Sequence, residues 1–514
     1  MLNWILALLS ALLSILVFPK FHYVWLAPVA LTPLLLAAAR EASPRRRFAL
    51  GWVCGVVYWA GVCYWIQFVL SVHGGMPPTE GWALLALFAF AKGIHMGVFA
   101  LVAGILMRRW WAVPTVAALW VAIEATHGSL GFAWLALGNA GIDMGLPLRL
   151  APITGVWGIS FLFAMMGTAL ALAAMGRPRI ELLWLLAVLF ALVLPPLPDQ
   201  VRGRETALLV QPNLSESEEW TPESFTGMLD ELGGLTLRGV LTEQQNPPSI
   251  VVWPEVPAPF YYDEDPRFRG FANQLAETTQ AYFLAGVVGR TMDGAPTNSA
   301  ELVSPAGTPV SRYDKVHLVP FGEFVPWPFG WLTRKISTEA GDFAAGTRVV
   351  VSPVGAHKIG AFICYESVFP GFVREFVANG AEVLFNISND GWFGRSAARM
   401  QHLDILRMRA AENGRWILRA TNDGITATID SAGRVRGALP SYVQATSYSG
   451  FRYISEETFY TRHGNWFAWL CGLIAVAGLA PSCIGTSTDR PFLRLAGAIA
   501  GPAGLSMRKG FSRK

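Results

Sequence analysis

The chain begins with long apolar runs, continues through a stretch in which short apolar runs alternate with polar ones, and returns to an apolar run near its end. A membrane-spanning helix needs about 20 apolar residues, with a range of about 17–25. The apolar runs lie near residues 3–18, 23–40, 48–71, 81–107, 111–127, 150–175, 179–197 and 464–485. We therefore predict a membrane domain of seven transmembrane helices over residues 1–200, and an eighth transmembrane helix over 464–485.

Basic residues in the loops predict the orientation of these spans, because Lys and Arg concentrate on the cytoplasmic side. The turn at 73–80 has no Lys or Arg, and residues 128–149 have only Arg149. The loops on the opposite side and the tail at 486–514 are basic, with Arg40, Arg45, Arg46, Arg47, Arg108, Arg109, Arg177, Arg179, Arg490, Arg494, Arg508, Lys509, Arg513 and Lys514. Both termini, including a basic tail over 486–514, are therefore predicted to be cytoplasmic, and the segment before the eighth span lies outside.

That outer segment, 203–462, has a different pattern. Short apolar runs that resemble strands lie at 207–211, 249–253, 281–288, 358–364, 382–387 and 416–420. Helix-like stretches lie near 222–240, 265–280, 368–379 and 396–413. Alternation of short strands with amphipathic helices favours α/β layers around a sheet. We predict a catalytic α/β domain that is tethered to the membrane at both ends.

Composition supports the membrane prediction and excludes some functions. The chain is 53% hydrophobic and 15% charged, with a mean hydropathy of +0.39, whereas soluble chains carry about 25% charged residues. There is no basic cluster interleaved with aromatic residues, so nucleic acid is not expected as a partner. The five cysteines form no CxxC or Cys/His pattern, so no metal site is predicted.

Three strings in the outer segment place a reactive side chain at or near the end of a predicted strand or in a polar loop. They are VVWPEVPAP with Glu255, RYDKVHLVPFGEFVPW with Lys315, and IGAFICYESVFP with Cys364. A thiol attacks a carbonyl as the thiolate, so it needs a base such as a carboxylate. An ammonium group and the backbone N–H of Tyr365 can then stabilise the oxyanion.

Each residue alone has an ordinary structural interpretation. A cysteine that ends an apolar strand is usually a buried core residue, a glutamate after Trp-Pro is usually a turn residue, and a loop lysine is usually solvated. The combination of the three strings favours catalysis. Lys92 and Glu124 lie in the predicted fourth and fifth spans, where charged side chains are often functional. The structural alternative is that Glu124 lies near the outer interface and caps a helix or reaches into the interface, so the role of both residues is left undecided by the sequence.

The same strings resemble the nitrilase superfamily, and the longer pattern resembles the apolipoprotein N-acyltransferase family. The resemblance covers nearly the whole chain. In the membrane part it rests on FAWLALGN (132–139) and LAPITGVWGISFL (150–162). In the outer part it rests on QPNLSESEEW (211–220), NISNDGWFG (386–394), HLDILRMRAAENGR (402–415) and LRATNDGITATID (418–430). It implies a multi-span α-helical membrane domain joined to a nitrilase-like αββα sandwich.

The resemblance also implies roles for individual residues. Glu255 matches the general base, Lys315 the oxyanion-stabilising lysine and Cys364 the acylated nucleophile. The positions that match supporting or substrate-binding residues are Glu323, Tyr365, Glu366, Trp220 and Trp392.

The implied reaction is a ping-pong transfer in the bacterial inner membrane, with the catalytic domain in the periplasm. Cys364 takes an acyl chain from the sn-1 ester of a phospholipid and passes it to the N-terminal diacylglyceryl-cysteine of an apolipoprotein, without a cofactor. A membrane-anchored nitrilase-type amidase is the main alternative, since it would use the same three residues. A transporter with a solute-binding outer domain is a second alternative, but we find no internal repeat and it leaves the three strings unexplained.

Overall fold

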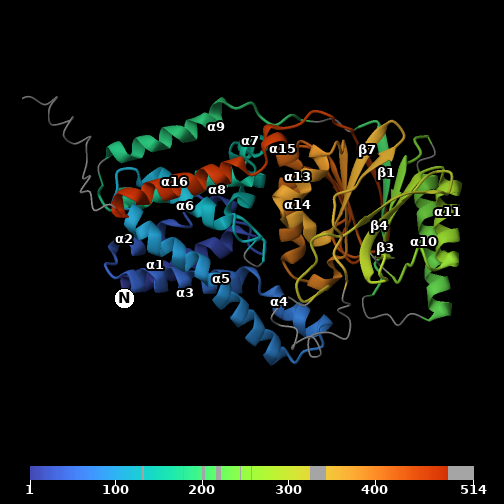
Figure 1. The fold of residues 1–514 in the computed structure, drawn as a ribbon, viewed down its shortest axis with the longest axis horizontal. Helices are drawn as coiled ribbons and strands as arrows, with labels where there is room; N and C mark the ends of the chain where they lie inside the picture. Colours follow the sequence, from blue (N-terminus) through green and yellow to red (C-terminus); the bar gives the residue numbers. More distant parts are fainter. Residues whose placement is uncertain are drawn as a thin grey trace, which may run out of the picture.

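The computed structural model describes residues 1–129, 132–177, 179–199, 203–215, 221–242, 245–255, 258–324 and 343–483. The helices of the first 200 residues and the last helix form one end of the molecule, and two β-sheets with their own helices form the other (Figure 1). We call these two ends the helical part and the catalytic domain.

The helical part is built from short and long helices. They are α1 (Leu2–Val17), η1 (Val24–Leu26), α2 (Thr32–Arg40), α3 (Pro44–Val62), α4 (Trp65–Phe68), η2 (Val69–His73), α5 (Pro78–Leu106), α6 (Ala112–Glu124), η3 (Leu137–Asp143), η4 (Pro147–Leu150), α7 (Ala151–Thr154), α8 (Val156–Ala174), η5 (Arg179–Val188), α9 (Leu189–Val193), α15 (Phe459–His463) and α16 (Trp466–Cys483).

The described helices include several that are candidates for membrane spans. By length and composition, α5 and α8 are each sufficient to cross a membrane, and α3 with α4 and η2 forms a third candidate that is bent by 55°. Shorter apolar helices include α1, α6 and residues 466–480 of α16. The predicted span at 23–40 is interrupted, because η1 ends at Leu26 and α2 begins at Thr32. Pro33 lies in the first turn of α2, where proline is tolerated. The arrangement of eight spans stays a prediction.

Small residues let α3 and α5 approach closely. A Cβ added at Gly51 would lie 2.2 Å from the Met96 carbonyl oxygen, and one at Gly55 would lie 2.8 Å from Gly93 Cα. Gly93 and Gly97 on α5 are likewise four residues apart, and both face α3 side chains or backbone. Two small residues four positions apart on each helix are typical of close helix pairs in membranes.

Two mixed sheets of six strands form the core of the catalytic domain. The first has the order β12-β1-β2-β3-β4-β5 and the second β11-β10-β9-β8-β7-β6. In each sheet the three central strands are parallel and the remaining pairs are antiparallel. The strands are β1 (Glu205–Gln211), β2 (Ile250–Val252), β3 (Tyr282–Arg290), β4 (Pro296–Val303), β5 (Pro309–Asp314), β6 (Val351–Val354), β7 (His357–Ile363), β8 (Val383–Ser388), β9 (Ile417–Thr421), β10 (Ala427–Ile429), β11 (Val435–Ala438) and β12 (Ala445–Phe451).

Helices cover the outer faces of the two sheets and complete a four-layer αββα sandwich (Figure 1). The helices α10 (Pro222–Thr242) and α11 (Pro266–Thr279) cover the first sheet, and α13 (Pro370–Ala378) and α14 (Ala398–Asn413) lie on the second. The second pair of helices also lies between its sheet and the helical part (Figure 1). Because α14 packs on both, most of its side chains are buried, including charged ones.

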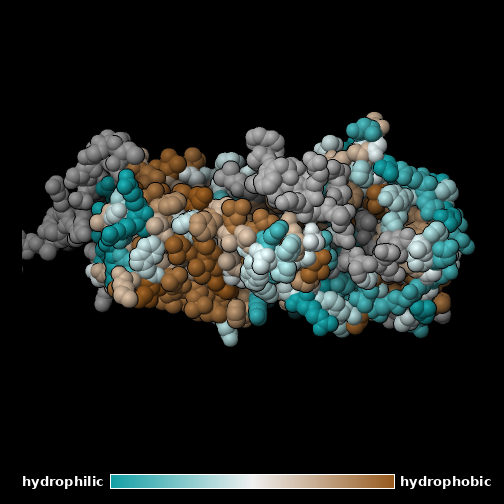
Figure 2. Space-filling model, turned by 90° about the horizontal axis from the view of Figure 1, so that it is seen from below, coloured by the Kyte–Doolittle hydropathy of each residue, from teal (hydrophilic) through white to brown (hydrophobic). Residues whose placement is uncertain are grey.

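The surface of the helical part is apolar. Figure 2 shows a broad hydrophobic band over the helices, whereas the surface of the sandwich is mainly hydrophilic. Large apolar side chains are exposed on several helices, among them Leu8 and Leu12 on α1, Leu87 on α5, and Trp469 and Leu473 on α16. Apolar residues exposed all along helices of this length are typical of a surface in contact with lipid.

Candidate active site

The three predicted catalytic residues follow strands at one edge of the sandwich. Glu255 lies three positions after β2, Lys315 directly after β5 and Cys364 directly after β7. The first two come from one sheet and Cys364 comes from the other. The backbone of Asn389, after β8, bridges the sheets by donating a hydrogen bond to Glu255 Oε2 at 2.8 Å. The site therefore lies where the two sheets meet.

Lys315 lies in a buried cluster with two carboxylates and one amide. Its Nζ is 3.0 Å from Glu255 Oε1 and 3.0 Å from Glu323 Oε1. Asn298 Nδ2 donates to the same two oxygens at 2.8 Å and 2.6 Å. The Val319 N–H donates to the other oxygen of Glu323 at 2.8 Å. Each of the two shared carboxylate oxygens thus accepts from both the ammonium and the amide, which fixes the position of the lysine.

The two carboxylates keep Lys315 charged although its side chain is only 1% exposed. Burial alone would lower the pKa of Lys315, but the charges of Glu255 and Glu323 outweigh burial and raise this pKa well above its ordinary value. A fixed ammonium in a water-poor site is suited to stabilise negative charge that develops on a substrate oxygen.

Cys364 begins a tight turn, η7 (Cys364–Val368), in which its own φ is +50°. A non-glycine residue in this left-handed region is strained, and such strain is concentrated at functional sites. Burial, and next the charge of Glu255, raise the pKa of the Cys364 thiol, while the charge of Lys315 lowers it. The thiol is therefore protonated at rest, and it needs a base to become a nucleophile.

Glu366 fastens this turn to the loop that carries Lys315. Its Oε1 accepts hydrogen bonds from the Tyr313 hydroxyl at 2.6 Å and from the Val316 N–H at 2.7 Å, and its Oε2 accepts from the Ile363 N–H at 2.8 Å. The side chain is fully buried, and burial raises the pKa of Glu366 to about 7. Glu366 thus holds Cys364 and Lys315 in register across the two sheets.

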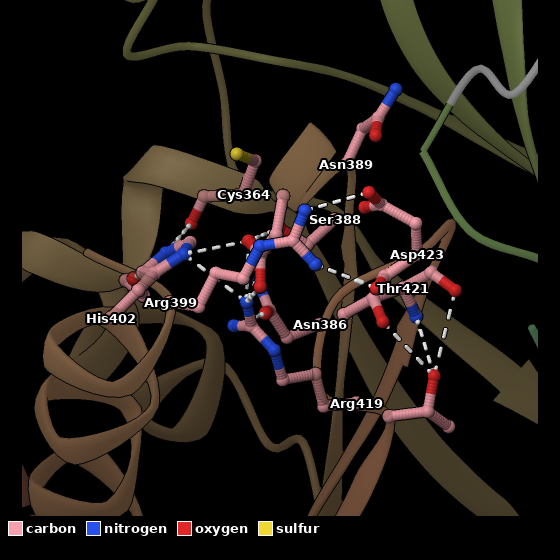
Figure 3. Close-up of polar contacts among 12 residues, drawn as sticks. Cys364, Asn386, Ser388, Asn389, Arg399, His402, Arg419, Thr421 and Asp423 are labelled. Carbon is pink, nitrogen blue, oxygen red and sulfur yellow. Dashed lines mark hydrogen bonds and ion pairs between the residues drawn. The ribbon is translucent and has the colours of Figure 1, made fainter. Parts of the chain in front are cut away.

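A second polar network supports Cys364 from behind (Figure 3). His402 Nε2 lies 3.1 Å from the Cys364 carbonyl oxygen and 2.8 Å from Ser367 Oγ. Since a carbonyl only accepts, Nε2 carries a hydrogen. Nδ1 lies 3.1 Å both from Arg419 Nη2, which can only donate, and from Asp390 Oδ1, which can only accept. Burial and then the charge of Arg419 lower the pKa of His402. Figure 3 shows the Cys364 carbonyl pointing toward His402 and the thiol pointing away.

Asp390 balances the charge of Arg419 in this network. Arg419 Nη2 lies 2.8 Å and 2.7 Å from the two Asp390 carboxylate oxygens, and both side chains are fully buried. Burial alone would raise the pKa of Asp390, but Arg419 outweighs it and holds the pKa well below its ordinary value. A buried ion pair of this kind is well placed to hold the Cys364 turn rigid.

Two of the remaining predicted residues, Tyr365 and Trp392, contact the helical part. Tyr365 contacts the helical part, where its hydroxyl donates to the Ala133 carbonyl at 3.2 Å. Trp392, on η8 (Asp390–Phe393), packs against His73 with 4.7 Å between ring centroids. Trp220 lies outside the described residues.

A cavity of about 850 Å³ lies between the helical part and the catalytic domain, next to this site. Its lining includes Trp134 and Asn139 from the helical part, and Val316, Tyr365 and Phe369 from the catalytic domain. Val316 and Tyr365 directly follow Lys315 and Cys364 in the chain. Ligand sites are typically clefts of about 300–1,000 Å³ with apolar walls and a few polar groups, so this cavity is the candidate substrate chamber.

The sequence did not point to several residues that the site contains. Asn298, on β4, is one of them, because an asparagine in a strand gives no sequence signal that predicts a role in a site. Asp390, His402 and Arg419 lie in strings that carry the family resemblance, but their convergence behind Cys364 depends on the second sheet and α14.

Comparison with known proteins follows the division seen in the fold. Residues 10–169 match the family model of the apolipoprotein N-acyltransferase N-terminal domain, and residues 223–449 match that of carbon-nitrogen hydrolases. The crystal structure of an amidase from Nesterenkonia sp. aligns with 53% of this chain and 97% of its own, at 17% identity and a TM-score of 0.39.

Curated relatives match along almost their whole length. An apolipoprotein N-acyltransferase of Geobacter metallireducens is 34% identical over 510 residues, which covers 93% of this chain and 95% of the relative. Relatives of the same name from Nitrosomonas europaea and Pseudomonas putida are 31% and 30% identical and cover 90% and 91% of this chain, and 94% and 95% of their own. The chain, with its helical part, αββα sandwich and buried Lys-Glu cluster beside a cysteine, therefore belongs to the apolipoprotein N-acyltransferase family.

Proposed function

We propose that this protein transfers an acyl chain from the sn-1 ester of a phospholipid to the α-amino group of the N-terminal diacylglyceryl-cysteine of an apolipoprotein, through a thioester on Cys364. The observation that carries the proposal is the buried contact of Lys315 with Glu255 and Glu323. The charges of Lys315 and Glu255 also both act on the Cys364 thiol.

In the first half-reaction Glu255 takes the proton of the Cys364 thiol while the sulfur attacks the ester carbonyl. Lys315 and the Tyr365 N–H stabilise the tetrahedral oxyanion. When the intermediate collapses, the ester C–O bond breaks, a thioester forms, and Glu255 returns the proton to the leaving alkoxide. The lysophospholipid is released.

In the second half-reaction the α-amino group of the lipoprotein attacks the thioester carbonyl. Glu255 accepts a proton from the attacking amine, the C–S bond breaks, and the proton returns to the Cys364 sulfur. The free thiol and an amide-linked third acyl chain result. The lysophospholipid leaves before the acceptor reacts, so the kinetics are ping-pong.

The setting of the site supports lipid substrates. Both substrates keep acyl chains in a bilayer, so the nucleophile must lie close to the membrane. The 850 Å³ cavity lies between the apolar helical part and the catalytic domain, and Val316 and Tyr365, which directly follow Lys315 and Cys364, line it. Burial of Lys315 and Cys364 limits the access of water, which would otherwise hydrolyse the thioester.

We further propose that the catalytic domain faces the periplasm of a bacterial cell and that both termini are cytoplasmic. The basic loops and the basic C-terminal tail support this orientation. The proposed division is a membrane domain over 1–200, the catalytic domain over 203–462, a last span over 464–485 and a basic tail over 486–514.

Intact-protein and peptide mass spectrometry after incubation with phospholipid tests the proposal. We expect one added acyl chain, located on the Cys364 peptide and absent from Cys364→Ala. An adduct on another residue would contradict the proposal. Turnover of a small amide with no acyl adduct from phospholipid would instead support the amidase alternative.

A further inference from the structure

Two charged side chains in the helical part, Lys92 and Glu124, are buried at 4% and 5% exposure. Lys92 is the middle residue of α5, and Glu124 is the last residue of α6. A charged side chain within a membrane-spanning helix is costly, and its retention calls for a partner or a function. Each of the two side chains has a backbone hydrogen-bond partner in the same short segment of the chain.

Residues 132–137, between α6 and the first turn of η3, are that segment. Its residues 132–136 belong to no helix or strand, and its residues 133–137 are buried. Irregular backbone among membrane helices must have its N–H and C=O groups satisfied by protein groups. Lys92 Nζ donates to the Phe132 carbonyl at 3.1 Å, at one end of the segment. At the other end, Glu124 Oε1 accepts from the Leu137 N–H at 2.6 Å.

Each charge is itself held in place. The Lys92 ammonium lies 4.8 Å from the centre of the Trp59 ring, a cation–π contact that offsets part of the lost hydration. Ser160 Oγ donates to the second Glu124 oxygen at 2.5 Å and accepts from the Gly138 N–H at 2.8 Å. Lys92 thus holds a carbonyl and Glu124 holds an amide, and the two ends of the segment are fixed independently.

The first two residues of the segment contact Tyr365, the residue that follows the nucleophile. The Phe132 ring stacks on the Tyr365 ring, with centroids 5.6 Å apart and 21° between planes. The Ala133 carbonyl accepts the Tyr365 hydroxyl hydrogen bond described above. Trp134 Nε1 donates to Gln401 on α14 at 2.7 Å, so the segment is also anchored to the catalytic domain. The position of Tyr365 therefore depends on the position of segment 132–137.

We propose that Lys92 and Glu124 are positioning residues that act on catalysis through segment 132–137 and the side chain of Tyr365. By fixing that side chain they fix the Tyr365 backbone N–H beside Cys364, which donates to the oxyanion. This inference rests on the proposed function. It assigns to the helical part a direct influence on the geometry of the oxyanion site, in addition to anchoring the catalytic domain.

The test compares two reactions of the same thiol. Acylation by phospholipid develops an oxyanion, whereas alkylation by iodoacetamide displaces iodide and develops none. The variants Lys92→Met and Glu124→Leu remove the two hydrogen bonds, and Glu124→Gln keeps an oxygen that accepts from Leu137. Phe132→Leu removes the ring stack without leaving a polar group unpaired. Glu80→Gln, an exposed carboxylate in the first turn of α5, is the control.

We expect Lys92→Met, Glu124→Leu and Phe132→Leu to lower the Cys364 acylation rate by about 10- to 100-fold, as for a small misplacement of a reacting group. Iodoacetamide should react at the wild-type rate, and Glu124→Gln and Glu80→Gln should acylate normally. Equal loss of both reactions would indicate general disruption and overturn the proposal, as would normal acylation in Lys92→Met and Phe132→Leu.

Hydrogen–deuterium exchange of the peptide that contains Tyr365 gives a readout independent of acyl transfer. We expect faster exchange in the three impaired variants and unchanged exchange in Glu124→Gln. Unchanged exchange in all variants would overturn the positioning role. If the wild type forms no acyl adduct with phospholipid, the proposed function fails, and the exchange data still decide whether Lys92 and Glu124 position Tyr365.

Discussion

Replacement of Lys315 by Met removes the ammonium and keeps an unbranched side chain of similar length. The variant leaves Glu255 and Glu323 joined through Asn298 Nδ2, with the cation that lay 3.0 Å from each carboxylate gone. Removing one partner of a buried ion pair costs about 3–5 kcal/mol of stability. Losing one oxyanion donor costs about 100- to 1,000-fold in rate, or about 2.7–4 kcal/mol of transition-state stabilisation.

We therefore expect Lys315→Met to lower the acylation rate of Cys364 by about 100- to 1,000-fold while phospholipid binding changes much less. Stopped reactions analysed by mass spectrometry give the rate, and equilibrium binding of a fluorescent phospholipid gives the affinity. Loss of affinity as large as the loss of rate would refute the oxyanion role and indicate a structural one.

The stability of the wild type and that of Lys315→Met should also depend differently on pH. The pKa of Lys315 is raised above its ordinary 10.5, so the stability that its ion pairs contribute is complete below that pH and is lost only at still higher pH. This contribution is therefore constant between about pH 5 and pH 9 in the wild type.

In Lys315→Met two carboxylates share one site, and repulsion raises the pKa of one of them. The folded variant then binds a proton more tightly than the unfolded chain, so its stability should rise as the pH falls. Thermal unfolding in detergent across this range measures the difference, and a variant equally destabilised at both ends of the range would contradict the arrangement of charges.

Other expectations follow from single contacts. Glu366→Gln replaces one accepting oxygen by an N–H₂ group, which then faces either the Ile363 N–H or the Tyr313 and Val316 donors. The variant should be destabilised by about 1.5–3 kcal/mol for each lost hydrogen bond to the carboxylate. A melting temperature equal to that of the wild type would contradict this role. His402→Phe removes the donor to the Cys364 carbonyl and should slow acylation at temperatures where the variant is still folded. A normal acylation rate would show that this hydrogen bond is dispensable. Met292→Cys places a thiol on a fully exposed turn of the catalytic domain, so an impermeant maleimide should label it in intact spheroplasts; labelling only after lysis would reverse the proposed orientation.

Local sequence patterns were sufficient for the elements that place the site. The predicted strands at 249–253 and 358–364 appear as β2 and β7, and the predicted helix at 396–413 appears as α14. These elements have continuous apolar runs or amphipathic spacing, which local patterns report well. Strands β4, β5, β6 and β10 to β12 were not predicted, because they are partly polar or very short and their identity depends on pairing with other strands.

The catalytic candidates could be named from three strings, but their convergence could not. Glu255 and Lys315 are brought together by the pairing of β2 with β3, β3 with β4 and β4 with β5, which no local pattern encodes. The roles of Lys92 and Glu124 were equally hidden, since their partners are backbone groups at 132 and 137 rather than charged residues. A sequence shows a buried charge, but only a structure shows which backbone group satisfies it.

A single-turnover chase shows directly whether the acyl chain passes from Cys364 to the acceptor. The enzyme is first acylated with a phospholipid that carries a labelled chain, the excess donor is removed, and a peptide with an N-terminal diacylglyceryl-cysteine is added. We predict that the label leaves the Cys364 peptide and appears on the α-amino group of the acceptor in equal amount, and that an N-acetylated peptide accepts none. Release of the label as free fatty acid, or a labelled acceptor produced by Cys364→Ala, would contradict the account.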